Sequence, residues 1–213
     1  MAVIKHPGHD YTDNPTSGIS PTPFDERAHT TGVDTIEVST VIYRSKADVY
    51  EFLVDFPRYA ELSEHLRTVY QDGDGSTGTS YRLEFAWWKL TYTAHSAVTD
   101  LIPSERIDWQ LTKDVDACGS WILESESAPE EHDAATRVRF VVHYDPQSVS
   151  SGVIDLPRFV SVSWVIERVK PLIRNEAERI LKRLVKAIEG KPRPVELEIH
   201  ANRGETDQTS GSP

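Results

Sequence analysis

The chain has 213 residues, with 34 acidic and 23 basic side chains and a formal net charge of −11 at pH 7. This length is enough for one domain with a substantial core. The negative charge argues against nucleic acid or anionic lipid as partners, because both are polyanions. The single cysteine, Cys118, rules out an intrachain disulfide and is typical of a reducing compartment.

The sequence contains no apolar run of the roughly 20 residues that a bilayer-spanning helix needs. Residues 1–13 lack the apolar segment of a signal peptide. We therefore expect a cytoplasmic protein without a transmembrane segment. Arginine outnumbers lysine by 15 to 8, and an acidic, lysine-poor composition suggests a halophilic source. An ordinary acidic protein is the alternative.

Polar segments flank the central part of the chain. Residues 1–32 are rich in proline and glycine and hold few large apolar side chains, so burial there offsets little of the entropy lost on ordering. The last residues are also polar. We expect a disordered N-terminal tail over 1–32, one folded domain over 33–200 and a disordered C-terminal tail over 201–213.

The domain begins with a predicted strand and two short helices. Apolar and polar residues alternate over 35–43, which indicates a strand. Ser45 is a favourable N-cap for a short helix after it. Pro57 ends that helix and suits the first turn of a second one, which reaches Leu62.

Six further strands are predicted over residues 67–71, 79–87, 90–100, 106–112, 120–127 and 137–144. Their clean alternation indicates an antiparallel sheet with one buried and one wet face. Short turns between consecutive strands predict a meander. The polar face carries Arg82, Glu84, Arg137 and Arg139, for which we expect weak cross-strand ion pairs.

The last predicted element is a long amphipathic helix over 165–189. Its apolar residues recur three and four positions apart, and Gly190 and Pro192 mark its end. Pro171 lies inside the pattern and predicts a kink. The sheet is the one candidate partner for so long an apolar stripe. A long helix in a curved sheet can enclose a cavity, which points to ligand binding.

The apolar strand face is unusually aromatic. Tyrosine and tryptophan need a partner for their O–H or N–H group when buried, and a ligand can supply one. The alternative is that these side chains simply fill the core. The predicted ligand-binding residues are Tyr81, Leu83, Phe85, Trp87, Tyr92, Trp109, Trp121, Phe140 and Tyr144.

Candidate general acids or bases are few. His95 and His143 lie mid-strand, and imidazole exchanges protons near neutral pH. Both fall on the more polar strand faces, where a solvated or hydrogen-bonded histidine is the alternative. Tyr81 is the third candidate. The sequence has no nucleophile elbow, phosphate loop or metal-ligand spacing, so we expect no metal and no cofactor.

A local pattern supports this order of elements. Residues 41–59 read Val-Ile-Tyr-Arg-Ser-Lys-Ala-Asp-Val-Tyr-Glu-Phe-Leu-Val-Asp-Phe-Pro-Arg-Tyr. The segment resembles the opening pattern of the START-related (SRPBCC) superfamily, which includes polyketide cyclase/dehydrase and coenzyme Q-binding relatives. The strand at 137–144 and the terminal helix fit the same template, so the resemblance covers about residues 34–190.

The resemblance implies an α+β helix-grip fold. In that fold a curved antiparallel sheet of six to seven strands wraps a long C-terminal helix, and two short helices follow the first strand. It also implies binding or transport of a lipophilic small molecule, such as a quinone, isoprenoid, lipid or polyketide-like compound, between sheet and helix. A cyclase or dehydratase acting in the same cavity is the alternative. A module that binds a protein partner is a second alternative.

Overall fold

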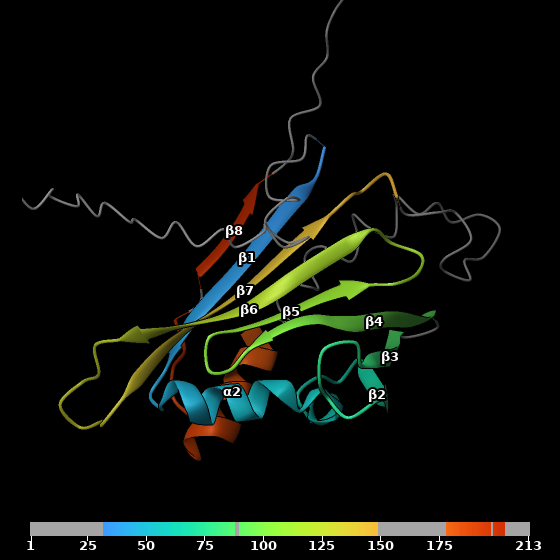
Figure 1. Cartoon of the computed structure of the whole chain (residues 1–213). Coiled ribbons are helices and arrows are strands. Elements are labelled where there is room, and N and C mark those ends of the chain that lie inside the picture. The colour runs from blue at the N-terminus through green and yellow to red at the C-terminus, as the bar shows by residue number, and fades with distance from the viewer. Residues whose placement is uncertain (1–31, 88–89, 149–177, 197, 203–213) are drawn as a thin grey trace, which may run out of the picture.

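The computed structural model describes residues 32–87, 90–148, 178–196 and 198–202 (Figure 1). The helices are α2 (Lys46–Val54), the 3-10 helix η1 (Phe56–Glu61) and a C-terminal helix described over residues 178–189. The strands are β1 (Asp34–Ile42), β2 (Leu66–Asp72), β3 (Ser80–Trp87), β4 (Leu90–Ile102), β5 (Arg106–Leu111), β6 (Ala117–Glu126), β7 (Ala135–Tyr144) and β8 (Glu198–Asn202).

All eight strands form one antiparallel sheet in the order β2-β3-β4-β5-β6-β7-β1-β8. The run from β2 to β7 confirms the predicted meander, and β1 pairs with the meander's last strand. The resemblance implied a sheet of six to seven strands, and the observed sheet has eight. The extra strand is β8, which pairs with β1 and contains residues 201 and 202, beyond the expected domain end at 200. It is short and mostly exposed, so no strong apolar alternation marks it in the sequence.

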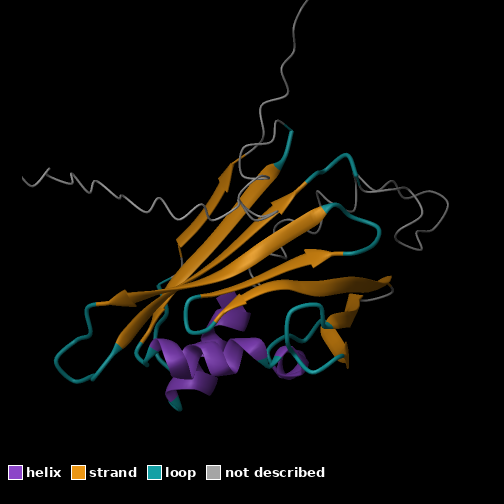
Figure 2. Ribbon diagram, in the orientation of Figure 1, coloured by secondary structure: helices purple, strands orange, loops and turns teal. Residues whose placement is uncertain are grey.

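The helices lie on one side of the sheet, which we call the inner face (Figure 2). Residues directly opposed in an antiparallel pair share a face. The register therefore carries the inner face from Ile107 to Trp121 and on to Phe140. The neighbouring row, from Asp108 to Ser120, belongs to the outer face.

The first helix begins where the sequence predicts. The backbone N–H of Asp48 donates to Ser45 Oγ at 3.2 Å, and Ser45 Oγ donates to Asp48 Oδ2 at 2.8 Å. This is the reciprocal N-cap expected at the start of a helix. The second helix is a 3-10 helix with Pro57 in its first turn, and Tyr59 fixes it by donating from Oη to the carbonyl of Leu53 at 2.5 Å.

The helices bury their apolar side chains against one end of the inner face. This end lies where β1, β4 and β6 finish and where β5 and β7 begin. Burying side chains of this size stabilises the fold by roughly 1.5–3 kcal/mol each. The buried apolar cluster comprises Ile42, Val49, Phe52, Leu53, Phe56, Leu62, Tyr81, Val98, Ile107, Leu123, Val138, Leu181, Leu184 and Val185.

The described part of the C-terminal helix ends as predicted. Gly190 has a φ of +80°, the left-handed conformation that commonly follows a helix. Its N–H donates to the carbonyl of Lys186 at 2.9 Å. The earlier part of the predicted helix, with the kink at Pro171, lies outside the described residues, as do residues 1–31 and 203–213.

Side chains tie the end of this helix to β1. Glu189 is 7% exposed and accepts the backbone N–H of Tyr43 at 2.8 Å. Arg193 donates to the same carboxylate at 2.8 and 2.9 Å. Arg44 donates to the carbonyls of Ile188 and Glu189 at 3.3 and 3.2 Å. These bonds hold the helix end beside the junction of β1 and α2.

Candidate ligand-binding site

A continuous row of aromatic rings crosses the inner face. Trp109 and Phe140 lie nearly parallel, with ring centroids 5.9 Å apart and an interplanar angle of 17°. Phe140 contacts Trp121 at 4.4 Å, and Trp121 meets Tyr59 edge-on at 6.2 Å. Offset and edge-to-face contacts of this kind stabilise aromatic clusters beyond the area they bury. The row joins three strands to the 3-10 helix.

The predicted ligand-binding residues divide into two groups along the strands. Tyr81 is 3% exposed and belongs to the packed cluster, where its ring contacts Phe56 at 4.8 Å. Leu83 and Trp121 are partly buried against the same cluster. The remaining residues lie toward the end of the sheet where β3 and β7 finish. We call this the open end; its half-buried aromatic side chains are Phe85, Tyr92, Trp109, Phe140 and Tyr144.

Register places the open-end side chains on one face. Tyr92 lies directly opposite Phe85, and Phe140 continues the row from Trp121. Trp87 ends β3, paired with Leu90; its side chain is not among those described. The alternation in the sequence therefore predicted which face these residues share. Their role in ligand binding stays a prediction.

Gly119 is a site residue that the sequence analysis missed. It lies opposite Trp109, and a Cβ atom there would come within 2.5 Å of both Trp109 Cζ2 and the carbonyl oxygen of Val141. The missing side chain lets the indole lie directly against the backbone of β6. A glycine inside a strand often marks such a close approach, and this was the available signal.

The tyrosine hydroxyls on or beside the inner face of the sheet fall into two classes. Tyr144 donates to Asp34 Oδ2 at 3.2 Å, and Tyr59 is bonded to Leu53. The Oη atoms of Tyr81 and Tyr92 are buried, and neither has a hydrogen-bond partner among the described residues. Native proteins rarely leave a buried hydroxyl unpaired, so these two atoms stand out as donors without an acceptor among the described residues.

Both hydroxyls stay protonated near neutral pH. Burial raises the pKa of Tyr92, and the carboxylate of Asp114 adds to the shift. Burial likewise raises the pKa of Tyr81, with smaller contributions from Asp55 and Asp74. A protonated phenol can donate a hydrogen bond to a ligand oxygen.

The positive side chains that register assigns to a face of the sheet lie on the outer face. Among the described strand residues that register assigns to the inner face, none is lysine, arginine or histidine. On the outer face Arg137 pairs with Glu126 at 2.8 Å, and Arg139 pairs with Glu37 at 2.7 Å. These are the expected cross-strand ion pairs. Arg82 instead stacks over the exposed ring of Tyr70 at 4.8 Å.

The two candidate histidines also lie on the outer face. His95 is opposite Arg82 in the pairing of β3 and β4. His143 is 4% exposed, and its Nδ1 lies 2.9 Å from Thr35 Oγ1. Neither imidazole shares a face with the aromatic residues. Of the three predicted catalytic candidates, only Tyr81 is on the inner face.

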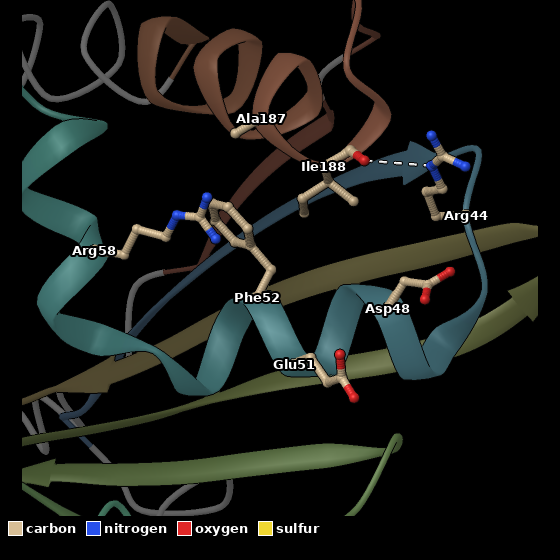
Figure 3. Close-up of a pocket in the computed structure, with 7 residues that line it drawn as sticks. All are labelled: Arg44, Asp48, Glu51, Phe52, Arg58, Ala187 and Ile188. Carbon is tan, nitrogen blue, oxygen red and sulfur yellow. Dashed lines mark hydrogen bonds between the residues drawn. The ribbon is translucent and has the colours of Figure 1, made fainter.

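A separate pocket of about 440 Å³ lies between α2 and the C-terminal helix (Figure 3). It opens widely to solvent and mixes both signs of charge with apolar groups. The guanidinium of Arg58 lies over the ring of Phe52 at 4.6 Å, and Arg44 donates to the carbonyls of Ile188 and Glu189, so both cations of the pocket are already engaged. The lining residues are Arg44, Asp48, Glu51, Phe52, Arg58, Ala187 and Ile188. This pocket lies between two helices, whereas the cavity predicted from the sequence lies between sheet and helix.

No cluster of three or more histidine, cysteine, aspartate or glutamate side chains in the described ranges could hold a metal ion. In the same ranges, no helix combines the length and the apolar character needed to cross a membrane. Cys118, the single cysteine of the chain, lies on β6 with its side chain buried.

Comparison with known proteins gives one family match. Residues 34–189 match the model of the family described as polyketide cyclase / dehydrase and lipid transport. No curated protein matches the chain in sequence.

Several solved structures are similar in fold. The Zhui aromatase/cyclase from Streptomyces sp. R1128 aligns with a TM-score of 0.55 at 15% identity, covering 74% of this chain and 94% of that one. A protein from Thermus thermophilus aligns with a TM-score of 0.53 at 14% identity, covering 73% and 97%. The di-domain ARO/CYC BexL from the BE-7585A biosynthetic pathway aligns with a TM-score of 0.51 at 17% identity, covering 78% and 53%. At such identities the likeness shows the fold alone.

Proposed function

Because the chain belongs to the polyketide cyclase/dehydrase and lipid transport family, we propose that it binds a lipophilic small molecule against the open end of the inner face. The observation that carries the proposal is the group of half-buried aromatic side chains there. Large aromatic side chains that helices leave incompletely covered are typical of ligand sites. The candidate ligands are quinones, isoprenoids, lipids and polyketide-like compounds.

In this proposal the ligand lies between the sheet and the C-terminal helix. The earlier part of the helix predicted from the sequence, over residues 165–177, lies outside the described part of the chain. The packed cluster closes the other end of the inner face. Its side chains, such as Leu53, Ile107 and Val185, are 0% exposed and leave no room for a ligand there.

Catalysis in the same site is the second candidate function. Two of the similar structures are described as aromatase/cyclases or ARO/CYC proteins. The protonated hydroxyl of Tyr92 supports this candidate, since it could donate a hydrogen bond to a substrate oxygen. The position of His95 and His143 on the outer face argues against them as the acid or base.

A protein-interaction module receives less support. Such a module would expose a large apolar patch. Among the described residues, Tyr70 is the one large apolar side chain that is exposed, at 44%. The half-buried aromatic side chains lie together on the inner face, which favours a small molecule.

The first test is organic extraction of the full-length protein, purified in high salt, followed by mass spectrometry. A lipophilic compound in stoichiometric amount would support the proposal and identify the ligand class. The same extraction from Trp109→Ala should yield several-fold less compound. Tyr70→Ala serves as the control, because Tyr70 lies on the outer face and should retain the wild-type amount.

Two results would count against the proposal. One is a compound that co-purifies equally with wild type and Trp109→Ala, since the ligand would then lie elsewhere. The other is a protein that is empty and also fails to bind any added lipophilic probe. An empty protein that converts an added polyketide-like substrate would favour the enzyme.

A further inference from the structure

We infer that the pocket between α2 and the C-terminal helix binds a small organic monocation with an apolar body, such as an arylalkyl amine. This site is separate from the open end of the inner face and does not rest on the proposed function. Its volume of about 440 Å³ is in the range of small-molecule sites. Three features of its lining point to this ligand, namely two carboxylates without a cationic partner, an apolar floor, and two arginines that are engaged elsewhere.

Two carboxylates give one side of the pocket a negative charge. Asp48 and Glu51 lie three residues apart on α2 and therefore share a face of the helix. Like charges at this spacing repel each other, and α2 has no lysine or arginine three or four residues from either of them. Asp48 Oδ2 accepts a hydrogen bond from Ser45, whereas Glu51 has no partner among the described residues. A ligand cation would offset this repulsion.

Arg44 does not neutralise the two carboxylates, although it lines the same pocket. Its Nε and Nη2 atoms donate to the carbonyls of Ile188 and Glu189 at 3.3 and 3.2 Å (Figure 3). The carbonyl groups at the end of a helix carry a partial negative charge, which a guanidinium group offsets. The positive charge of Arg44 is therefore directed at the end of the C-terminal helix, and the negative charge on α2 remains.

The floor of the pocket is apolar. Phe52 is 7% exposed and belongs to the packed cluster, and Ile188 is half-buried beside it. In Figure 3 these two side chains lie between Arg58 on one side and Asp48 on the other. A ligand that reaches across this floor from the carboxylates therefore places an apolar body on Phe52 and Ile188.

Arg58 determines what suits the far end of the ligand. Its guanidinium lies over the ring of Phe52 at 4.6 Å, and guanidinium groups stack on aromatic rings. The side turned away from Phe52 is exposed to solvent and can stack on an aromatic ring of the ligand. A second cation at this end would be repelled. The lining thus favours one ammonium group at the carboxylates and a ring at Arg58.

The test titrates the full-length protein with phenylpropylamine and with probes that each change one feature. Phenylpropanol lacks the charge, phenylpropanoate reverses it, propylamine lacks the ring, and heptanediamine replaces the ring by a second ammonium group. Proton–nitrogen NMR spectra report affinity and location together. We expect phenylpropylamine to bind here about threefold or more tightly than any other probe. It should shift the amide signals of Glu51, Phe52 and Ile188, and leave the indole signal of Trp109 in the open end unchanged.

The variant Glu51→Gln isolates the charge. It should weaken phenylpropylamine binding by about two- to fivefold and leave phenylpropanol binding unchanged, because the side chain keeps nearly the same shape. Glu84→Gln is the matched control, since it removes the same charge from the outer face of β3, and it should change neither. An equal loss in both variants would mean that the amine responds only to the net charge of the chain, which would overturn the inference.

Three other results would also overturn it. Phenylpropanol or phenylpropanoate binding as tightly as the amine would show that the carboxylates take no part. Shifts confined to Trp109 and its neighbours would place the amine in the open end instead. No shift at millimolar phenylpropylamine would mean that the pocket binds no such cation. The proposed function is tested separately, because extraction from Trp109→Ala does not involve α2.

Discussion

Tyr59 of η1 and Tyr81 of β3 differ in how their hydroxyls are bonded. Tyr59 Oη donates to the carbonyl of Leu53, while Tyr81 Oη has no partner among the described residues. A hydrogen bond contributes about 0.5–1.5 kcal/mol to stability, and removing one partner leaves the other unsatisfied. The two side chains therefore offer a matched test of what each hydroxyl contributes.

We predict that Tyr59→Phe lowers the free energy of unfolding by about 1 kcal/mol, because the carbonyl of Leu53 loses its donor. Tyr81→Phe should leave it unchanged or raise it slightly, since the substitution removes an unpaired polar atom. Urea denaturation of both variants measures the difference. An equal loss in Tyr81→Phe would mean that its hydroxyl has a partner, such as an ordered water.

A second prediction concerns Gly119. Gly119→Ala should destabilise the protein by about 1–3 kcal/mol, because the added methyl group meets the indole of Trp109 and the carbonyl of Val141. Trp109→Leu in the same background should recover part of the loss by removing the indole contact. The near-ultraviolet circular dichroism of Gly119→Ala should change as the indole moves. Strictly additive effects of the two substitutions would contradict direct contact between these residues.

Sequence reasoning reached some of these residues and not others. Alternation placed Tyr81, Trp109 and Phe140 on one face, since a side chain's face depends on its parity in the strand alone. The division between the packed cluster and the open end depends on where helices cross the sheet. The hydrogen bonding of the hydroxyls depends on residues distant in sequence, such as Tyr144 and Asp34. The sequence alone therefore predicted neither this bonding nor the division of the inner face.

At the scale of elements, the end of the C-terminal helix is its best-anchored point. Glu189 joins the backbone of Tyr43 to the side chain of Arg193, which also donates to the carbonyl of Val41 at 2.5 Å. The ring of Tyr43 lies between the guanidinium of Arg193 at 4.1 Å and the imidazole of His132 at 4.6 Å. These contacts fix the end of the helix relative to the sheet.

The charge of Glu189 makes this anchor sensitive to acid. Burial alone would raise its pKa, but hydrogen bonds from Arg193 and the Tyr43 backbone outweigh burial and lower the pKa below the ordinary 4.5. A carboxyl group with a lowered pKa in the folded state stabilises that state above its unfolded pKa. This contribution is lost as the pH falls below about 4.5 and through the folded pKa.

We therefore predict that Glu189→Gln is less stable than the wild type near neutral pH, and that the gap narrows at about pH 4 and below. Denaturant unfolding of both proteins at several pH values measures the gap. Glu51→Gln is the control, because Glu51 is exposed on α2, and it should track the wild type throughout. A gap that stays constant with pH would contradict a role for the ionised carboxylate.

Elements with a regular hydrophobic pattern could be predicted from the sequence, and elements that depend on pairing with distant residues could not. The alternation of β3, β5 and β7 and the cap at Ser45 led to the observed strands and helix within a few residues. The segment at Pro57 was predicted as a short helix, but its 3-10 form was not. Strand β8 could not be foreseen, because it is defined by pairing with β1 and buries little.

At the scale of the whole molecule, charge is arranged by face. Among the described strand residues that register assigns to the inner face none is positive, while the outer face carries ion pairs such as Arg139 with Glu37. The chain as a whole has a net charge of −11. Salt therefore acts on stability in two opposite ways, by screening the repulsion among acidic groups and by weakening the surface ion pairs.

The balance of these two effects tests the hypothesis that the source is halophilic. Exposed ion pairs are individually worth about 1 kcal/mol or less, whereas repulsion from a large excess of one charge is shared over the whole surface. We predict that the free energy of unfolding rises between about 0.1 and about 2 M KCl, over which the screening length falls from about 10 Å to below 3 Å. Thermal unfolding across this range measures the change.

A charge variant separates the two contributions. Arg139→Gln removes the ion pair with Glu37 and makes the net charge more negative, so it should lower stability at low salt and steepen the rise with KCl. Repeating the series with sucrose at equal osmolarity distinguishes charge screening from general solute exclusion, because sucrose carries no charge. Stability that stays flat or falls in KCl would contradict the hypothesis. The ion pairs of the outer face would then outweigh the repulsion among the acidic residues.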